Sequence, residues 1–157
     1  MPSQGRVYTV VISGVASPAA AFDFLELVPA TSKPVTLLRI RIAQTSEPTT
    51  EEEQLALTIT RGQTTSGSGG SAPTPVPLAS TDTASGCTAE TMNTTQATGG
   101  SPVILLEDAW NTRAGIDIAF APEEAPQAVN GERLIVKSSA PADAVTIRAT
   151  FWFEEQG

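Results

Sequence analysis

The sequence predicts an all-β fold, an antiparallel β-sandwich with jelly-roll topology. About nine short segments alternate apolar and polar residues or are rich in β-branched residues, and Gly, Pro, Asn or Ser residues separate them. No segment sustains the apolar period of about 3.6 residues that an amphipathic helix requires. Strands at this spacing, without helices between them, favour a sandwich, and a jelly roll is a common way to protect its sheet edges. The 157 residues are expected to form one domain, 1–157.

The first two strands are predicted at 6–13 and 20–28, which precede Gly14 and Pro29 respectively. The first is rich in β-branched residues. Strict alternation in the second would divide its side chains between two faces, with Phe22, Phe24 and Glu26 on one and Asp23, Leu25 and Leu27 on the other. The two Phe side chains are expected to fill the core.

The next two strands are predicted at 35–44 and 55–61, both from apolar alternation. In the first of these, Arg39 and Arg41 lie opposite the apolar residues and are expected to face solvent or an interface. The acidic run 51–53 is interpreted as a solvated loop, because calcium loops need ligands spaced around a turn.

Residues 62–77 are rich in Gly, Ser, Thr and Pro and are predicted to form a long extended loop or arm. A loop of this length within a domain is usually functional or disordered. The segment lacks the Lys and Ser/Thr of a phosphate-binding loop. Its interface candidates are Gly62, Thr64, Pro73 and Pro75.

The remaining strands are predicted at 88–95, 103–106, 116–120, 134–137 and 145–153. In the last of them, Trp152 lies on the face opposite Phe151 and Phe153, and Arg148 shares the face of Trp152. This mixed aromatic and polar surface suits subunit contact, so Trp152 and Arg148 are interface candidates. Trp110 is a further candidate, with a place in the core as the alternative.

Composition argues against several classes of function. The chain has no His, 17 acidic and 9 basic residues, and a net charge of -8, with the basic residues dispersed. A direct nucleic-acid partner is therefore not expected, because phosphate binding needs clustered cations. No apolar stretch approaches the length of a membrane-spanning helix, and no secretion signal is expected at the N-terminus.

No residue pattern predicts catalysis, a cofactor or a metal site. Without His, imidazole-based triads and zinc sites are excluded. Glu107 and Asp108 beside Trp110 suggest glycoside chemistry, but adjacent strand residues point to opposite faces. The single Cys87 has no partner for an intramolecular disulfide and is interpreted as a small hydrophobic residue.

Three motifs carry a resemblance to a known group of proteins: the run 61–75, then Thr98-Gly99-Gly100, then 107–115. Together with the flanking strand patterns, they resemble small proteins encoded by tailed phages and prophages, and the likeness covers most of the chain. The resemblance implies a virion structural protein, a capsid decoration or cement protein on the outside of the shell, commonly trimeric. It carries over no functional residues.

The resemblance implies further expectations about partners and location. The partners would be the major capsid protein or other virion subunits, and the protein would be made in the host cytoplasm and reside on the capsid surface as a homo-oligomer, with a trimer favoured. The loop 62–77 and the N-terminal residues would supply arms across neighbours. The alternative is a receptor- or glycan-binding module of a tail fibre or spike, with Trp110 as the sugar platform. A non-viral adhesive or structural β-domain is a third reading.

Overall fold

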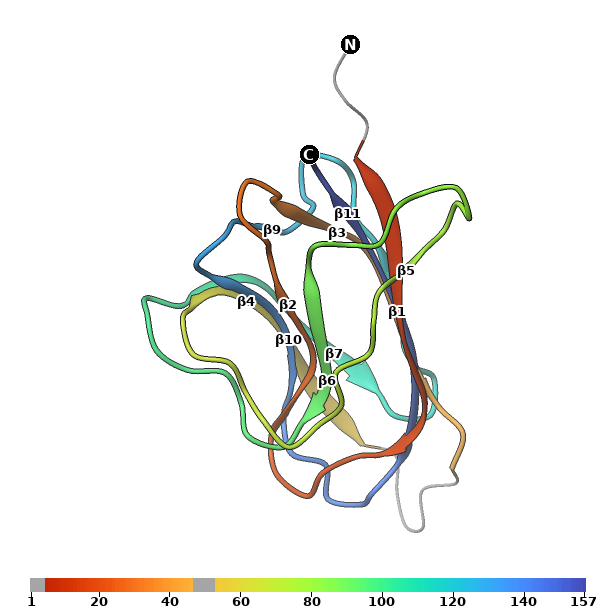
Figure 1. Cartoon of the computed structure of the whole chain (residues 1–157). Helices are drawn as coiled ribbons and strands as arrows, with labels where there is room; N and C mark the ends of the chain where they lie inside the picture. Colours follow the sequence, from red (N-terminus) through yellow and green to blue (C-terminus); the bar gives the residue numbers. More distant parts are fainter. Residues whose placement is uncertain (1–4, 47–52) are drawn as a thin grey trace.

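The computed structural model describes residues 5–46 and 53–157, and this part of the chain is built from strands and contains no helix (Figure 1). All nine predicted strands are present; the strand at 35–44 has the predicted bounds, and the others have shifted ends. The strands are β1 (Arg6–Ala16), β2 (Phe22–Val28), β3 (Val35–Gln44), β4 (Gln54–Gln63), β5 (Val76–Pro77), β6 (Thr88–Asn93), β7 (Val103–Asn111), β8 (Ile116–Ala119), β9 (Gln127–Ala128), β10 (Arg133–Ser138) and β11 (Thr146–Glu155). The two-residue strands β5 and β9 are too short to leave an alternating pattern.

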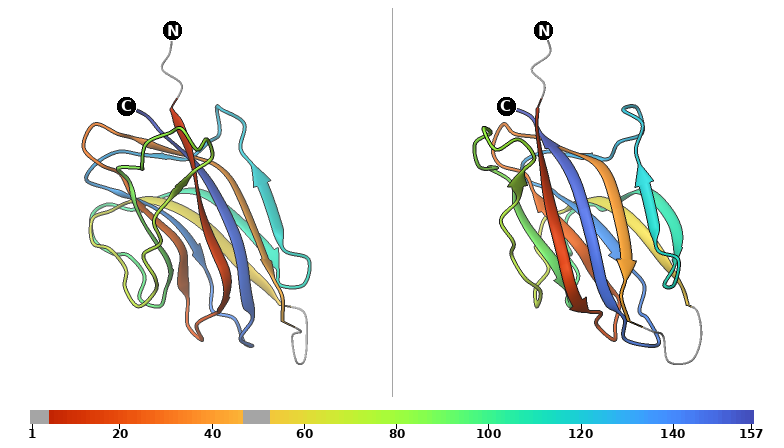
Figure 2. Two further views of the ribbon diagram at one scale, coloured as in Figure 1. Left: turned by 45° about the vertical axis from the view of Figure 1, so that its right-hand side comes forward. Right: turned by 90° about the vertical axis from the view of Figure 1, so that its right-hand side faces the viewer.

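The strands form two antiparallel sheets packed face to face as a sandwich, which confirms the predicted all-β class (Figures 1 and 2). The first sheet has the order β5-β1-β11-β3-β8, with β9 also paired to β3. The second has the order β6-β2-β10-β4-β7. The C-terminal strand β11 lies between β1 and β3, so residues at opposite ends of the sequence are hydrogen-bonded neighbours.

The core lies between the two sheets and is formed by the inward side chains of both. In the first sheet, Tyr8 and Phe153 stack with ring centroids 5.6 Å apart. In the second, the ring of Phe24 meets Phe22 and Trp110 edge to face, at 4.8 and 5.7 Å. Burial of such side chains contributes roughly 1.5–3 kcal/mol each, and this burial is the main source of stability in a chain without a disulfide.

Strand β2 contains a bulge that corrects the predicted division of its faces. The neighbours Val136 and Lys137 on β10 pair with Leu25 and Asp23, so β2 carries one extra residue, Phe24, at this point. The extra residue reverses the alternation. The four apolar side chains therefore all lie in the core: Phe22, Phe24, Leu25 and Leu27. Asp23 and Glu26 are buried as well, but they bond to residues outside the strands.

The Gly/Ser-rich region, predicted at 62–77 as a long extended loop or arm, does not extend from the domain. Strand β4 continues to Gln63, and β5 covers Val76–Pro77. Between them, residues 64–72, here called the Gly/Ser segment, run beside residues 91–98 of the same chain (Figure 1). Three pairs exchange backbone hydrogen bonds in both directions at 2.8–3.0 Å: Thr65 with Thr98, Ser68 with Thr95, and Ser71 with Thr91. The predicted N-terminal arm, residues 1–4, and Glu51 and Glu52 lie outside the described residues.

Two buried carboxylates of β2 attach the Gly/Ser segment and residues 91–98 to the second sheet. Glu26 is 0% exposed, and its Oε2 accepts a hydrogen bond of 2.9 Å from the backbone N–H of Gly67. Its Oε1 lies 3.7 Å from Nε of Arg133. Asp23, also 0% exposed, accepts a 2.8 Å hydrogen bond at Oδ2 from the N–H of Ala97. The bulge at Phe24 therefore presents both carboxylates to the loops that cover them.

The glycines of the Gly/Ser segment permit this close approach. A Cβ on Gly67 would lie 2.5 Å from the carbonyl oxygen of Thr95, and one on Gly70 would overlap the carbonyl oxygen of Thr91. Any side chain at these positions would push the Gly/Ser segment away from residues 91–98 and break the paired backbone hydrogen bonds.

Asp23 is expected to make the stability of the fold depend on pH. Burial raises its pKa from 3.8 to about 6, against the lowering effect of the Ala97 N–H. Since the folded pKa lies above the unfolded one, the free energy of unfolding should fall as pH rises through about 6. Between pH 4 and 7.5 the loss from this group is about 2 kcal/mol. Urea unfolding across this range should show a flatter profile for Asp23→Asn.

The exposed Asp117 is the matched control for this pH dependence. Its pKa lies below the ordinary value, so Asp117→Asn should not flatten the profile between pH 4 and 7.5. If the free energy of unfolding changes equally with pH in the wild type and in Asp23→Asn, the pKa of the Asp23 carboxyl is not raised by folding.

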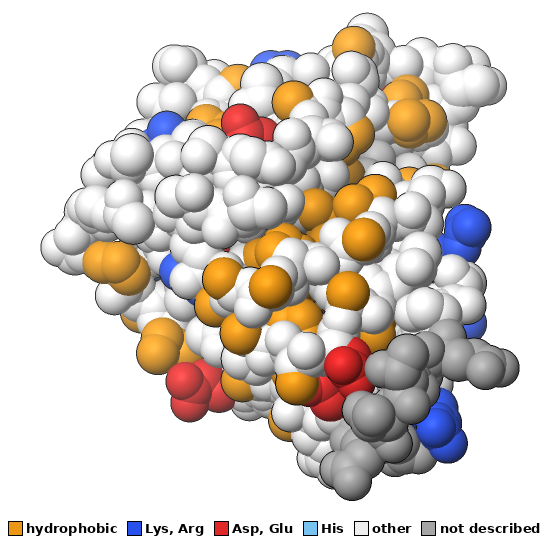
Figure 3. Space-filling model, turned by 90° about the horizontal axis from the view of Figure 1, so that it is seen from below, with side chains coloured by type: hydrophobic (Ala, Val, Ile, Leu, Met, Phe, Trp, Pro, Cys, Tyr) orange, Lys and Arg blue, Asp and Glu red, His pale blue; other side chains and the backbone are white. Residues whose placement is uncertain are grey.

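The lower end of the sandwich in Figure 1 is closed by the connections 17–21 and 139–145. Ser17 and Val145 join these connections, because Ser17 N–H donates to the Val145 carbonyl at 2.8 Å and Val145 N–H donates to Ser17 Oγ at 3.0 Å. Viewed from below, apolar side chains gather at the centre of this end (Figure 3). The connections are rich in Ala and Pro.

Candidate functional site

The outer face of the first sheet is the most distinctive exposed surface of the described chain. The right-hand view of Figure 2 looks onto β1, β11 and β3 side by side, and no other described segment crosses them. By contrast, the outward carboxylates of β2 in the second sheet bond to the loop residues Gly67 and Ala97. The uncovered face is therefore the surface of the sandwich most available to a partner.

Strand register places three rows of side chains across this face. Each row takes one residue from β1, β11 and β3 in that order: Thr9, Trp152 and Arg39; Val11, Thr150 and Arg41; Ser13, Arg148 and Ala43. We call these nine residues the Trp152 face. Small side chains lie between Trp152 at one end and Arg148 at the other, which leaves an open hollow of about 450 Å³.

Trp152 is supported by an ion pair that spans two further strands. The guanidinium carbon of Arg39 lies 5.3 Å from the centroid of the Trp152 ring, in a cation–π contact. Arg39 in turn donates two hydrogen bonds to the Asp117 carboxylate of β8, at 2.8 and 2.6 Å. These hydrogen bonds hold the pKa of Asp117 below its ordinary value, although burial acts in the opposite direction. The Trp152 ring is therefore held in place before any partner binds.

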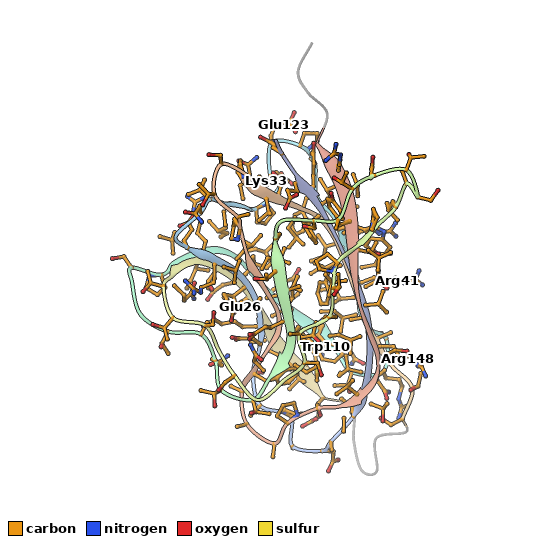
Figure 4. The ribbon with its side chains drawn as sticks, viewed as in Figure 1. Glu26, Lys33, Arg41, Trp110, Glu123 and Arg148 are labelled. Atoms are coloured by element: carbon orange, nitrogen blue, oxygen red, sulfur yellow. The ribbon has the colours of Figure 1, made fainter. Side chains whose placement is uncertain are left out.

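Arg41 and Arg148 provide cationic groups beside Trp152. Both side chains are exposed on the same outer side of the sheet (Figure 4). Among described residues, Arg148 has one long hydrogen bond, 3.5 Å to Ser13 Oγ, and neither arginine forms an ion pair within 4.0 Å. The residues that line the hollow include no carboxylate. The site is thus locally positive on a chain whose net charge is -8.

This combination of groups is suited to binding rather than to bond making. A rigid Trp next to arginines is the composition that dominates protein interface energetics, because both side chains combine apolar area with directional polar contacts. Val11, 53% exposed, adds apolar area on the side of Thr150 opposite Arg41. The hollow can accept a flat or apolar group that carries one or two carboxylates.

The structure brings Trp152 and Arg148 together and places the other predicted site residues elsewhere. Trp110 of β7 is 1% exposed and packs on Phe24 in the core (Figure 4). The core interpretation of Trp110 is therefore confirmed. Its predicted use as a sugar platform is wrong for this structure, because the ring offers no surface to a ligand.

The four candidates from the Gly/Ser-rich region lie against their own chain. Gly62, near the end of β4, lies beside the carbonyl of Ser101. Thr64 N–H donates to the Thr98 carbonyl at 3.2 Å, although the Thr64 side chain is exposed. Pro75 is buried, and it lines a small hollow with Pro73 and residues 85–89. Pro73 and Pro75 thus pack within the domain instead of projecting from it.

Sequence reasoning missed Val11 and Asp117 as parts of this site, whereas alternation in 145–153 already put Thr150 on the face of Trp152. It did place Arg39 and Arg41 on an outward face, which the structure confirms. Alternation in each strand marks outward residues but does not say which strands are neighbours. The sequence did contain one signal for this site, because outward-facing Arg residues occur in two separate predicted strands, 35–44 and 145–153.

Other groups capable of chemistry do not assemble into a site. Within residues 5–46 and 53–157, no cluster of three or more Cys, Asp or Glu side chains could hold a metal ion. Cys87 is 2% exposed, and burial together with Glu155 raises the pKa of its thiol to about 12, so it stays protonated at neutral pH. Glu107 and Asp108 are both exposed on the edge strand β7.

No helix long and apolar enough to cross a membrane is present in the described ranges. Comparisons with family models, with curated proteins and with solved structures each find no match to this chain.

Proposed function

We propose that this chain is a structural protein of a phage virion, a capsid decoration or cement protein that binds other protein subunits through the Trp152 face. The observation that carries the proposal is the hollow itself, where Trp152 is held by Arg39 and flanked by the exposed Arg41 and Arg148. Such a prearranged surface lowers the entropic cost of binding. The partners would be the major capsid protein, other virion subunits or further copies of this chain, on the outer surface of the capsid.

The strand order supports a jelly-roll topology as part of this proposal. Without the short strands β5 and β9 and the edge strand β6, the sheets have the orders β1-β11-β3-β8 and β2-β10-β4-β7. Successive strands then pass from one sheet to the other, except that β4 and β7 are neighbours. This is the pattern expected of two wrapped Greek keys, an architecture used by viral capsid and lectin domains.

We also propose that the role is binding without catalysis. The single thiol is buried, with a raised pKa, and the carboxylates Glu107 and Asp108 are exposed neighbours on an edge strand. The glycan-binding alternative loses the aromatic residue assigned to it, because Trp110 lies in the core. That alternative, and a non-viral adhesive or structural domain, become outcomes of the test.

The test is to count this protein in purified particles from its source by quantitative mass spectrometry. We expect a high copy number relative to the major capsid protein, in a ratio that fits capsid symmetry. A few copies per particle would contradict a decoration role and support the tail or spike alternative. Absence from particles would support the non-viral reading.

A binding assay tests the role of the Trp152 face directly. Purified protein is added to particles that lack it, and bound protein is quantified. Trp152→Ala should reduce binding at least about tenfold, because the anchor residue is lost. Leu78→Ala removes a 60% exposed apolar side chain outside this face and should bind like the wild type. Equal binding by both variants would exclude the Trp152 face as the interface.

A further inference from the structure

Two arginines of the Trp152 face, Arg41 and Arg148, form no ion pair within 4.0 Å among the described residues. Arg41 and Arg148 are exposed, and the lining of the hollow contains no carboxylate. Asp117, the acidic residue beside the face, forms its ion pair with Arg39, and Arg41 opposite it in the strand register attracts it without an ion pair within 4.0 Å. A ligand that places two carboxylates next to an apolar group would satisfy both arginines and cover the Trp152 ring.

One exposed turn of this chain has that composition. Residues 121–124 read Ala-Pro-Glu-Glu, and a 2.9 Å hydrogen bond from Glu124 N–H to the Ala121 carbonyl closes the turn. Pro122, Glu123 and Glu124 are exposed, and among described residues neither carboxylate has an ion pair within 4.0 Å. Two adjacent carboxylates thus follow a rigid apolar ring.

The turn and the hollow lie apart on the same molecule. Figure 4 shows Glu123 at the upper end, whereas Arg41 and Arg148 lie along the side of the first sheet. In the right-hand view of Figure 2 the connection from β8 to β9 projects from the body at this end. A turn that projects away from its own sheet is accessible to another molecule.

We propose that the hollow of the Trp152 face binds the 121–124 turn of a second copy of this chain. Pro122 would pack on the indole of Trp152, and the carboxylates of Glu123 and Glu124 would pair with Arg41 and Arg148. This inference rests on the proposed use of the Trp152 face as a protein interface, and it names the partner.

The symmetry of the contact follows from its two unlike halves. The hollow and the turn are different surfaces, so each copy would offer one half to each of two neighbours. Head-to-tail contacts of this kind close into rings when the rotation permits. A ring of three copies matches the trimer expected from the sequence resemblance.

Charge reversal tests the contact on the full-length protein by sedimentation equilibrium and native mass spectrometry. Two double variants are made, Arg41→Glu with Arg148→Glu, and Glu123→Arg with Glu124→Arg. Each alone should raise the dissociation constant at least about tenfold, because like charges then face each other. Mixed together, the two variants should associate again into alternating chains or even-membered rings, since each supplies what the other lacks, whereas a closed ring of three would keep one like-charged contact. Glu107→Arg with Asp108→Arg reverses another exposed acidic pair and should associate like the wild type.

The salt dependence of association and the circular dichroism of each variant are two further measurements in this test. Raising NaCl from about 0.05 to about 0.5 M should weaken association of the wild type, because exposed charges are screened. Circular dichroism verifies that each variant is folded, as expected for exposed positions. A wild type that is monomeric throughout a concentration series, or reversed variants that associate normally, would overturn this proposal.

The two proposals fail in different ways. A monomeric protein that still binds particles through Trp152 would overturn the copy-to-copy contact and leave the virion role intact. Restored association in the mixture, with no protein in purified particles, would support the contact and contradict the virion role.

Discussion

Trp110→Ala is expected to lower the free energy of unfolding by about 3–5 kcal/mol, the usual cost of truncating a large aromatic side chain in a core. The ring is 1% exposed and meets Phe24 edge to face at 5.7 Å, so its removal leaves a cavity between the sheets. Urea unfolding followed by circular dichroism measures the loss, because the substitution removes one of the two tryptophans as a fluorescence probe.

Two further variants separate this effect from a role in binding. Trp110→Phe keeps an aromatic ring against Phe24 and removes an indole N–H that has no hydrogen-bond partner among described residues, so it should cost less than Trp110→Ala. Trp152→Ala, on the outer face, should cost about 1 kcal/mol or less. If Trp110→Ala unfolds at the same urea concentration as the wild type, the ring is not part of the core.

Glu26→Ala should lower the free energy of unfolding by about 3 kcal/mol, as expected when one partner of a buried charge pair is removed. The substitution takes away the acceptor of the Gly67 N–H and the carboxylate opposite Arg133. The substitution should destabilise the Gly/Ser segment more than it destabilises the fold as a whole. Hydrogen exchange at the amides of Gly67 and Ser68 should accelerate, because the Gly/Ser segment loses its attachment to β2.

Glu26→Gln is the matched control for this prediction. It keeps an oxygen that can accept the Gly67 hydrogen bond but removes the charge that faces Arg133. We expect an intermediate loss of stability and largely preserved exchange protection at Gly67. Unchanged protection in Glu26→Ala would mean that the backbone pairs with residues 91–98 hold the Gly/Ser segment by themselves.

The Gly/Ser-rich region is attached to the rest of the domain along its length. Its composition is typical of a flexible arm, and an arm would reach a neighbouring subunit. In the structure, six backbone hydrogen bonds join three of its residues to residues 91–98, and the buried carboxylate of Glu26 attaches it to β2 at Gly67. This region is therefore a fixed part of the domain, and in the proposed virion role the Trp152 face, instead of an arm, would contact other subunits.

The sequence by itself determined the strands and the outward faces of several of them. Alternation with a period of two depends only on local exposure, so 35–44 and 145–153 could be assigned with Arg39, Arg41, Arg148 and Trp152 facing outward. The absence of His excluded imidazole chemistry in the same direct way.

The tertiary structure alone decided which strands meet and where the alternation changes. Pairing of β11 with β1 and β3 joins residues more than a hundred positions apart, and only this pairing brings Val11, Arg41 and Trp152 onto one surface. The bulge at Phe24 depends on the register with β10, which a single strand does not reveal. The burial of Trp110 and of the two carboxylates likewise depends on what packs against them, because burial is a property of neighbours and not of local pattern.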